Sequence, residues 1–414
     1  MKIFTGIKEL VTLSGAARKD GRHVNEEDLT VVANGAIVEN KGRLAWVGSE
    51  KDIPPQYRKK AQRVSLRADC VMPAFVECHT HLVFSGDRRN EFELRNKGVS
   101  YQEIARQGGG IRSTVRATRA ASEAELVALA RQRAGVFLRQ GVTTIESKSG
   151  YGLEEKGELK ILEVIQKLSK ERGGARWVGT YLGAHAIPEG RTADDYLDEM
   201  MEKTLPLVSR RKLSQRVDMF VEDGYFTPEA AKKYFSRASG LGFRLTAHAD
   251  QLTRTGAGVL LASLGAESVD HLVHISSRDI EELAKSKTTC VLLPASDFYL
   301  KINYPPARKL VDEGARVALA TDYNPGSSPV QDLSLVGVLA RLEMKMSLPE
   351  VIAGYTVGAA HALGLGADLG SLDVGKFCDF IQLSGSWRDL FYGVGHHPVA
   401  QVYKEGRRID LKKT

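Results

Sequence analysis

From about residue 70 onward, short apolar segments of β type alternate with longer segments of helical pattern, and this alternation constrains the fold most strongly. A strand followed by a helical crossover is typical of a parallel sheet. Eight such units predict an α/β fold of the (β/α)8 TIM-barrel class. A doubly wound open sheet also shows this alternation, but it usually has fewer strands. The apolar segments are 70–82, 142–149, 177–187, 217–222, 244–250, 268–275, 289–296 and 316–323.

The two ends of the chain have a different pattern. Residues 30–48 contain short apolar runs separated by Asn-Gly and Lys-Gly turns, which are typical of a β hairpin or meander. After a last helical pattern near 349–363, the segment 370–408 is again rich in β-type runs. We therefore predict that residues 1–68 and 370–414 form one composite small β domain, a β-sandwich, beside a hydrolase barrel of residues 69–369.

Composition limits the class of protein. The chain has 414 residues, 43% hydrophobic and 26% charged, which is typical of a globular protein. No segment approaches the ~18 apolar residues of a membrane helix, and the N-terminus lacks the apolar run of a signal peptide. The four cysteines form no CxxC pair, so we expect reduced thiols in a cytoplasmic protein. The net charge is +7, but Lys and Arg are scattered, so we expect no nucleic-acid or membrane partner.

Polar residues gather at the C-terminal ends of the predicted strands, where barrels carry their active sites. His79 and His81 are two residues apart on one strand, so their side chains point to the same face. His248 ends the fifth strand and Asp322 ends the eighth. Three imidazoles and a carboxylate converging from separate strands predict a site for a divalent first-row metal with an open position for water. The alternative is that these four residues only make hydrogen bonds to their neighbours at the barrel mouth. Their position at the same end of the barrel disfavours this alternative.

Such a site predicts hydrolysis of a polarised carbon, because a bound metal lowers the pKa of its water towards ~7. A proton acceptor must then lie beside that water. Asp322 is one candidate, and His271 on the sixth strand is the other, with a purely structural role for His271 as the alternative. The motifs GxxxxGK[ST], GxSxG and HExxH of other enzyme classes do not occur in the sequence.

These features resemble the amidohydrolase superfamily, and so does the segment GSLDVGK at 370–376. Longer segments resemble one family within it, the imidazolonepropionases, over essentially the whole chain. This resemblance implies hydrolytic ring opening of 4-imidazolone-5-propanoate, a small anionic imidazolone, to N-formimidoyl-L-glutamate in histidine degradation. Hydroxide would attack the ring carbonyl, and the C–N bond would open as the nitrogen takes a proton. The segments are RRNEFELR (88–95), GGGIRSTVRATR (108–119), ESKSGYGL (146–153), HADQL (248–252) and ATDYNPGSSP (320–329).

The family pattern implies metal binding by the three histidines and the aspartate named above, and substrate contacts at seven further positions. Among these, an arginine is suited to bidentate recognition of the propionate carboxylate. The chain departs from the family pattern at Cys78 and in the segment 296–299, and both departures are expected to tune the pocket. The substrate positions are Arg88, Tyr151, His185, Gln251, Asn324, Gly326 and Ser327.

Two positions separate this chain from other relatives in the superfamily. Deaminases usually carry Glu three residues after the fifth-strand histidine, where this chain has Gln251, which cannot transfer a proton. Binuclear relatives often carry Lys on the fourth strand, which here ends near Glu222, while Lys148 lies on the second. We therefore expect one divalent ion per chain, Zn2+ or Fe, unless Glu222 supports a second. We also expect the protein to form a homodimer. The alternatives are another cyclic amidohydrolase or aminohydrolase, and a binding barrel without catalysis.

Overall fold

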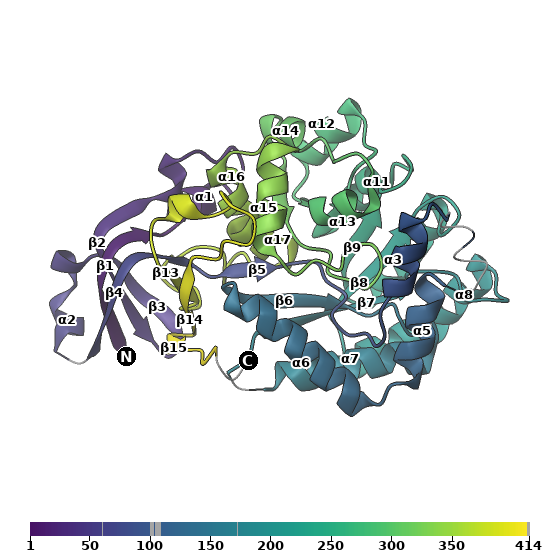
Figure 1. Ribbon diagram of the computed structural model, residues 1–414, viewed down its shortest axis with the longest axis horizontal. Coiled ribbons are helices and arrows are strands. Elements are labelled where there is room, and N and C mark those ends of the chain that lie inside the picture. The colour runs from purple at the N-terminus through teal and green to yellow at the C-terminus, as the bar shows by residue number, and fades with distance from the viewer. Residues whose placement is uncertain (60, 100–102, 104–108, 172, 412–414) are drawn as a thin grey trace.

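Two β sheets organise the chain in the computed structural model, which describes residues 1–411 apart from 60, 100–102, 104–108 and 172. In Figure 1 the larger sheet and its helices lie to the right, and the smaller sheet lies to the left with strands from both ends of the chain. The predicted fold class is confirmed: a parallel α/β barrel with a small β domain built from both chain ends.

The larger sheet has eight parallel strands that follow one another in chain order. An isolated parallel bridge between Thr80 and Tyr323 joins the segments that follow the first and last strands, so the barrel closes at its C-terminal end. The strands are β5 (Phe75–Glu77), β6 (Val142–Lys148), β7 (Arg176–Ala184), β8 (Arg216–Val221), β9 (Arg244–Ala249), β10 (Ser268–His271), β11 (Thr289–Leu292) and β12 (Arg316–Leu319).

The first predicted strand, 70–82, is divided between the two sheets. Its first residues end β4 (Gln62–Pro73) of the small sheet, and its middle residues form β5 of the barrel. The Ala74 amide still donates to the Asp379 carbonyl beside the small sheet, whereas the Phe75 amide donates to the Gly141 carbonyl just before β6. The chain therefore changes sheets between two consecutive residues.

Helices follow the barrel strands and cover the outside of the barrel (Figure 1). Ser122 and Glu125 form a capping box at the start of α6 (Glu123–Arg139), which satisfies two backbone amides of its first turn. The other helices of this part are α7 (Glu155–Ser169), α8 (Ala193–Glu199), the π-helix η3 (Met200–Thr204), α9 (Leu205–Arg210), α10 (Pro228–Gly240), α11 (Ala257–Ser263), α12 (Ser277–Lys285), α14 (Ala307–Asp312), α15 (Leu333–Leu342), α16 (Leu348–Ala353), the π-helix η4 (Gly354–Gly358) and α17 (Ala359–Ala362).

Three more helices follow the C-terminal ends of barrel strands. α3 (Arg89–Asn96) and α5 (Ile111–Ala120) come after β5, and α13 (Pro294–Leu300) comes after β11. Phe92 of α3 stacks on Tyr299 of α13, with ring centroids 5.3 Å apart, so two loops distant in sequence meet at the mouth. The sequence also predicts a mobile cover over 84–111, and residues 100–102 and 104–108 of that segment lie outside the described residues.

The small β domain is one continuous mixed sheet of seven strands instead of two facing sheets, in the order β15-β14-β13-β4-β1-β2-β3. β1 and β4 pair in parallel, and the other neighbours are antiparallel. The remaining elements of this domain are β1 (Lys2–Val11), α1 (Ser14–Arg18), η1 (Glu27–Leu29), β2 (Val31–Asn40), β3 (Arg43–Ser49), η2 (Glu50–Asp52), α2 (Pro55–Arg58), β13 (Phe380–Leu383), η5 (Trp387–Asp389), β14 (Val399–Lys404) and β15 (Arg407–Arg408).

Aromatic packing and an ion pair fix the C-terminal strands to the rest of the chain. Phe4 of β1 packs edge-on against Phe380 of β13, with ring centroids 5.1 Å apart, and Phe380 stacks on Tyr403 of β14. Arg176 at the start of β7 donates to the buried Asp379 carboxylate at 2.7 Å. The N-terminal strands, the C-terminal strands and the barrel are therefore joined through β13.

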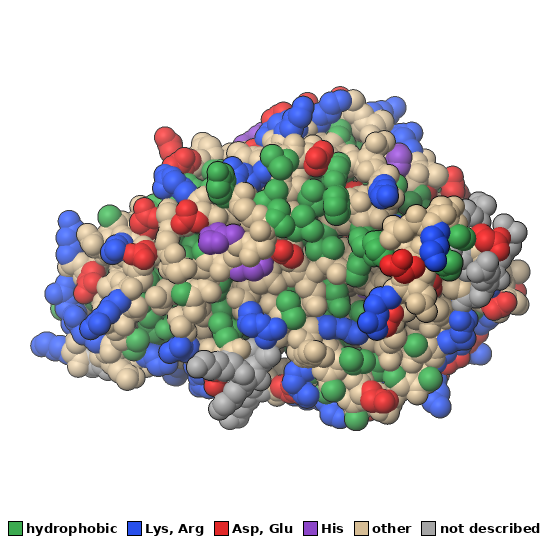
Figure 2. All heavy atoms as spheres, in the orientation of Figure 1, with side chains coloured by type: hydrophobic (Ala, Val, Ile, Leu, Met, Phe, Trp, Pro, Cys, Tyr) green, Lys and Arg blue, Asp and Glu red, His purple; other side chains and the backbone are tan. Residues whose placement is uncertain are grey.

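The visible surface carries its charges in a mixed pattern. Lys and Arg side chains are interspersed with Asp and Glu over the face in Figure 2, and they form no single basic stripe there. Among the described residues, no helix is both long enough and apolar enough to cross a membrane.

Candidate active site

A cavity of about 400 Å³ opens where the barrel strands end, a size typical of small-molecule sites. Every residue predicted for the site except His79 lines this cavity, and His79 lies fully buried next to it. The predicted residues that line it are His81, Arg88, Tyr151, His185, His248, Gln251, His271, Asp322, Asn324, Gly326 and Ser327.

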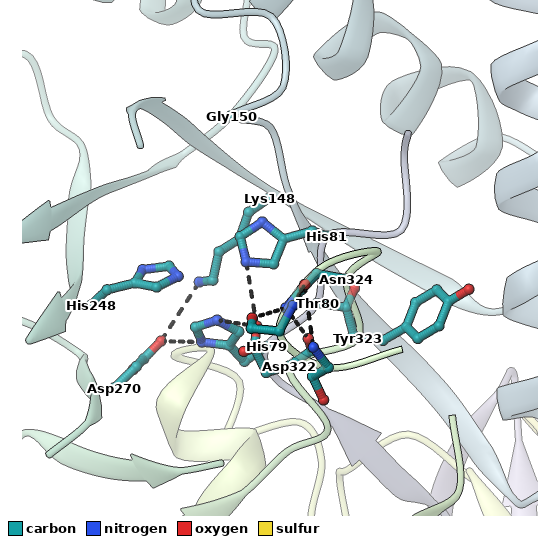
Figure 3. Close-up of polar contacts among 12 residues, drawn as sticks. His79, Thr80, His81, Lys148, Gly150, His248, Asp270, Asp322, Tyr323 and Asn324 are labelled. Atoms are coloured by element: carbon teal, nitrogen blue, oxygen red, sulfur yellow. Dashed lines mark hydrogen bonds and ion pairs between the residues drawn. The ribbon is translucent and has the colours of Figure 1, made fainter. Parts of the chain in front are cut away.

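Three histidines meet at the bottom of the cavity (Figure 3). His79 and His81 follow β5 and His248 lies in β9, and their donor nitrogens all lie within 4.8 Å of one another. The Asp322 Oδ1 atom lies 3.4 Å from His79 Nε2 and 3.5 Å from His81 Nε2. The structure therefore brings together the four residues that the sequence analysis expected to bind a metal. Cys78 directly precedes His79, and its side chain packs into an apolar cluster instead of facing the histidines.

Two aspartates orient two of these histidines. His79 Nδ1 donates to Asp270 Oδ2 at 2.6 Å, and His248 Nδ1 donates to Asp218 Oδ1 at 3.0 Å. Each bond leaves the Nε2 atom of that ring facing its neighbours, and neither Nε2 makes a hydrogen bond within the described part of the chain. Carboxylates behind metal-binding imidazoles commonly fix the tautomer in this way. The donor set thus fits a divalent metal ion.

Burial and nearby charge shift the pKa values of the site in opposite directions. Burial and Lys148 lower the pKa of His79, but the carboxylates of Asp270 and Asp322 outweigh them and raise it to about 9. Burial dominates at His81 and lowers its pKa to about 4. Although burial raises the pKa of Asp322, its contacts with His79 and His81 hold it well below the usual range. A site that favours a proton on His79 also attracts a metal cation, which would displace that proton.

His271 lies at the edge of this group. Its ring centroid is 5.3 Å from that of His248, and neither ring nitrogen has a hydrogen-bond partner among the residues described. Burial holds the pKa of His271 well below its ordinary value, so the imidazole is neutral. The backbone of His271 (φ 78°) and that of Asp322 (φ 53°) are left-handed, a conformation that costs energy in a non-glycine residue and is concentrated at functional sites.

An arginine and a tight turn form the opposite wall. Thr114 of α5 accepts a hydrogen bond from Arg88 Nε at 3.0 Å and so fixes the guanidinium. A Cβ atom on Gly326 would lie 2.1 Å from Arg88 Nη1, so the arginine occupies space that only glycine leaves open. Asn324 Oδ1 accepts hydrogen bonds from the backbone amides of Gly326 and Ser327 at 2.8 Å each. The carboxamide of Asn324 therefore shapes the turn as well as lining the cavity.

Three further predicted residues line the cavity between the histidines and the loops. His185 stacks on His81, with ring centroids 5.1 Å apart and an interplanar angle of 17°. The Gly150 carbonyl lies 3.0 Å from His185 Nδ1, and the Tyr151 ring lies 5.5 Å from His185. Burial lowers the pKa of His185 well below its ordinary value, so this ring is also neutral. Together with Gln251, these rings form flat, polar-edged walls.

Among the described residues, Glu222 is not part of the group that could hold a metal ion. Its carboxylate accepts hydrogen bonds from the backbone amides of Leu252 at 2.8 Å and Thr253 at 3.0 Å, and from the Thr253 hydroxyl. Glu222 thereby anchors the loop that follows Gln251. The histidine triplet is the one group of three or more His, Cys, Asp or Glu side chains in the described residues that could hold a metal ion.

Two sets of residues were not predicted from the sequence to belong to the site. One is the buried pair Asp218 and Asp270, with Lys148 beside them, whose Nζ lies 2.8 Å from Asp218 Oδ2 and 3.6 Å from Asp270 Oδ2. Asp218 lies between the apolar Val217 and Met219 of a barrel strand, and Asp270 directly precedes His271; these positions are the signal that could have found the pair. The other set comes from α3 and α13, where local sequence gives no signal of the contact; it includes Phe92, Arg95 and Tyr299.

Several known proteins are similar to this chain in sequence or in fold. The model of the amidohydrolase family matches residues 70–409. The imidazolonepropionase of Bdellovibrio bacteriovorus is 52% identical over 410 residues, which cover 98% of this chain and 96% of that protein. That of Solibacter usitatus is 42% identical over 407 residues and covers 97% of each. The solved structure of an adenosine deaminase from Xanthomonas campestris with bound zinc has a TM-score of 0.71 at 18% identity, covering 98% of this chain and 92% of that chain, a likeness of fold.

Proposed function

The chain belongs to the amidohydrolase family and, within it, to the imidazolonepropionases, and we propose that it opens the ring of 4-imidazolone-5-propanoate with water to give N-formimidoyl-L-glutamate. One observation carries this proposal. A single cavity of about 400 Å³ holds both a metal-binding donor group and the guanidinium of Arg88, as a substrate with a hydrolysable ring and a carboxylate requires.

The metal ligands in this proposal are the three histidines of the cavity floor and Asp322. One divalent ion, Zn2+ or Fe, is proposed per chain, because Glu222 is already occupied by the loop at 252–253. When bound, the ion supplies Lewis acidity and lowers the pKa of water. Three imidazoles and one carboxylate suit either metal about equally.

Arg88 binds the propionate carboxylate in our proposal. Its Nε is held by Thr114, and within the described chain no protein group accepts a hydrogen bond from Nη1 or Nη2. The two terminal amino groups of the fork are thus free for a carboxylate, which suits bidentate recognition. The Gly326–Ser327 turn lies against the same guanidinium and completes the pocket for this end of the substrate.

Asp322 and His271 handle the protons. Asp322 is ionised and lies at the cavity floor, so its carboxylate can take a proton from the attacking water. His271 is neutral and lines the same cavity, so it can accept that proton from Asp322 and pass it on to the departing ring nitrogen. Tyr151, His185 and Gln251 hold the flat ring between them. Gln251 cannot donate a proton as a glutamic acid would, which favours ring opening over deamination.

The reaction is proposed for the cytoplasm, and the unpaired state of all four buried cysteines supports a reducing environment.

Turnover of 4-imidazolone-5-propanoate by metal-loaded protein tests the function, with the product identified by mass. We expect N-formimidoyl-L-glutamate, loss of activity on chelation and its return on adding metal. Asp322→Asn should abolish turnover, whereas the control Asp312→Asn, on the exposed end of α14, should not change it. Metal-loaded protein that leaves this substrate intact would contradict the proposal.

A further inference from the structure

We infer that Lys148, the last residue of β6, is a positioning residue that holds the two aspartates behind the metal-binding histidines and thereby sets the affinity for the metal. The inference rests on the metal site of the proposed function, but it does not depend on which substrate is used. The Lys148 side chain does not line the cavity, and in the described chain its ammonium group pairs with carboxylates that are not among the four proposed ligands.

Lys148 contacts both aspartates from one buried position. Its side chain is 1% exposed, and Nζ forms an ion pair with Asp218 Oδ2 at 2.8 Å and lies 3.6 Å from Asp270 Oδ2. The same two aspartates receive the Nδ1 protons of His248 and His79. One ammonium group therefore acts, through one residue each, on two ligands from separate parts of the chain, His79 after β5 and His248 in β9. Figure 3 shows Lys148 next to Asp270 between the histidines.

The end of β6 also fixes the segment that carries His79 and His81. The Lys148 amide donates to the Thr80 carbonyl at 2.8 Å, and the Thr80 hydroxyl donates to the Glu146 carbonyl at 2.6 Å. Lys148 Nζ donates to Glu146 Oε1 at 2.9 Å, while Glu146 Oε2 accepts the Thr80 amide at 3.2 Å. Backbone and side-chain contacts from one strand end thus converge on the residue between the two histidines.

Electrostatics explains why a lysine is needed at this point. Both aspartates are buried, and without the ammonium group beside them their carboxylates would repel each other. The carboxylates would then shift away from the Nδ1 atoms of His79 and His248, so each ring would lose the partner that fixes its tautomer and orientation. Ion pairs with Lys148 hold both carboxylates in place, and both histidines turn Nε2 towards the cavity floor.

A different role for Lys148 would have the opposite effect on metal affinity. If the lysine only neutralised charge, its removal would strengthen the attraction between the remaining carboxylates and a divalent cation. If it positions the aspartates, its removal weakens metal binding, because loss of such supporting partners typically reduces affinity by about 10- to 100-fold. The sign of the change separates the two roles.

The test compares Zn2+ affinity of metal-free wild type and Lys148→Met, measured by competition with a chromogenic chelator without substrate. The control is Lys376→Met, which removes a half-buried lysine whose Nζ donates, within the described part of the chain, only to the backbone carbonyls of Gly366 and Leu369. We expect roughly 10- to 100-fold weaker binding for Lys148→Met and no change for the control. Equal or tighter binding by a folded Lys148→Met would overturn the inference.

Two further measurements keep the test decisive. Lys148→Arg retains the positive charge but not the contacts of Nζ with the two aspartates. It should therefore also weaken metal binding and shift the visible absorption of Co2+-loaded protein. If Lys148→Met does not fold by circular dichroism, this Arg variant decides, and wild-type affinity and spectrum in it would refute a positioning role. Wild-type protein that binds no metal would overturn both proposals. Wild type that binds metal but leaves the imidazolone intact would overturn only the proposed substrate.

Discussion

Gly326→Ala is predicted to weaken binding of the substrate carboxylate by displacing Arg88. The backbone of Gly326 is not left-handed, so alanine fits its conformation, and the conflict is purely steric. The new Cβ atom would lie 2.1 Å from Arg88 Nη1 and 2.8 Å from Cζ, whereas ordinary contact begins at 3.4 Å. The guanidinium must therefore retreat by about 1.3 Å, the difference between the contact and the clash distances.

A shift of this size is large compared with the tolerance of a bidentate pair. We expect the loss of one charge-assisted hydrogen bond, worth roughly 1.5–3 kcal/mol, which corresponds to about a 10- to 150-fold rise in KM. Because the carboxylate lies away from the reacting bond, binding in the ground and transition states should weaken alike, and kcat should change little.

Steady-state kinetics with 4-imidazolone-5-propanoate measures this effect. The control is Gly240→Ala at the end of α10, where a Cβ atom meets nothing within 4 Å. A substrate analogue in which an amide replaces the carboxylate should show the same KM in wild type and Gly326→Ala. An unchanged KM for the natural substrate in the variant would refute the assignment of Arg88 to the carboxylate.

Three further predictions concern the protons, the metal and a buried acid. His271→Ala should lower kcat by roughly 10²- to 10⁴-fold without changing metal content, and His274→Ala should not; normal turnover would remove His271 from the mechanism. Chelation should lower the melting temperature, and excess Zn2+ should restore it, because the ion binds the folded site; a melting curve that ignores chelator would exclude a resident metal. Burial and the nearby Asp322 raise the pKa of Asp297 to about 8, so the folded metal-free protein holds this proton more tightly than the unfolded chain and loses stability as pH rises from about 4 to 8. Asp297→Asn should therefore gain stability over wild type in urea denaturation at pH 8 and much less at pH 5, and an equal difference at both pH values would contradict this.

The fold could be predicted from local sequence pattern, except where the hydrogen-bond partner of a backbone amide decides to which sheet a residue belongs. Each of the strands from β6 to β12 coincides with an apolar segment, because strands buried on both faces read as continuous apolar runs. The change of sheet at Ala74 and Phe75 lies inside one such run. Nothing in that run distinguishes an amide that bonds to Asp379 from one that bonds to Gly141. The homodimer stays a prediction, since a single chain carries no contact that tests it.

The candidate site could be predicted to the extent that it follows from strand ends. Barrel geometry brings every strand end to one face, so His81, His248 and Asp322 could be grouped before any distance was known. The wall formed by α3 and α13 could not be predicted, because the stacking of Phe92 on Tyr299 depends on how two loops cross the mouth. Lengths and compositions of such loops do not determine that path.

The order of the strands explains why the charged residues behind the site belong together. Inside such barrels, side chains from alternate strands share a layer. Lys148, Asp218 and Asp270 come from β6, β8 and β10, the second, fourth and sixth strands, whereas His79 and His248 come from the first and fifth. A buried layer of two aspartates and one lysine excludes water, so its charges need partners within the protein. The lysine, which also pairs with the buried Glu146, cannot offset all of these negative charges, and a cation among the histidines would offset a further one, which ties the packing of this layer to metal binding.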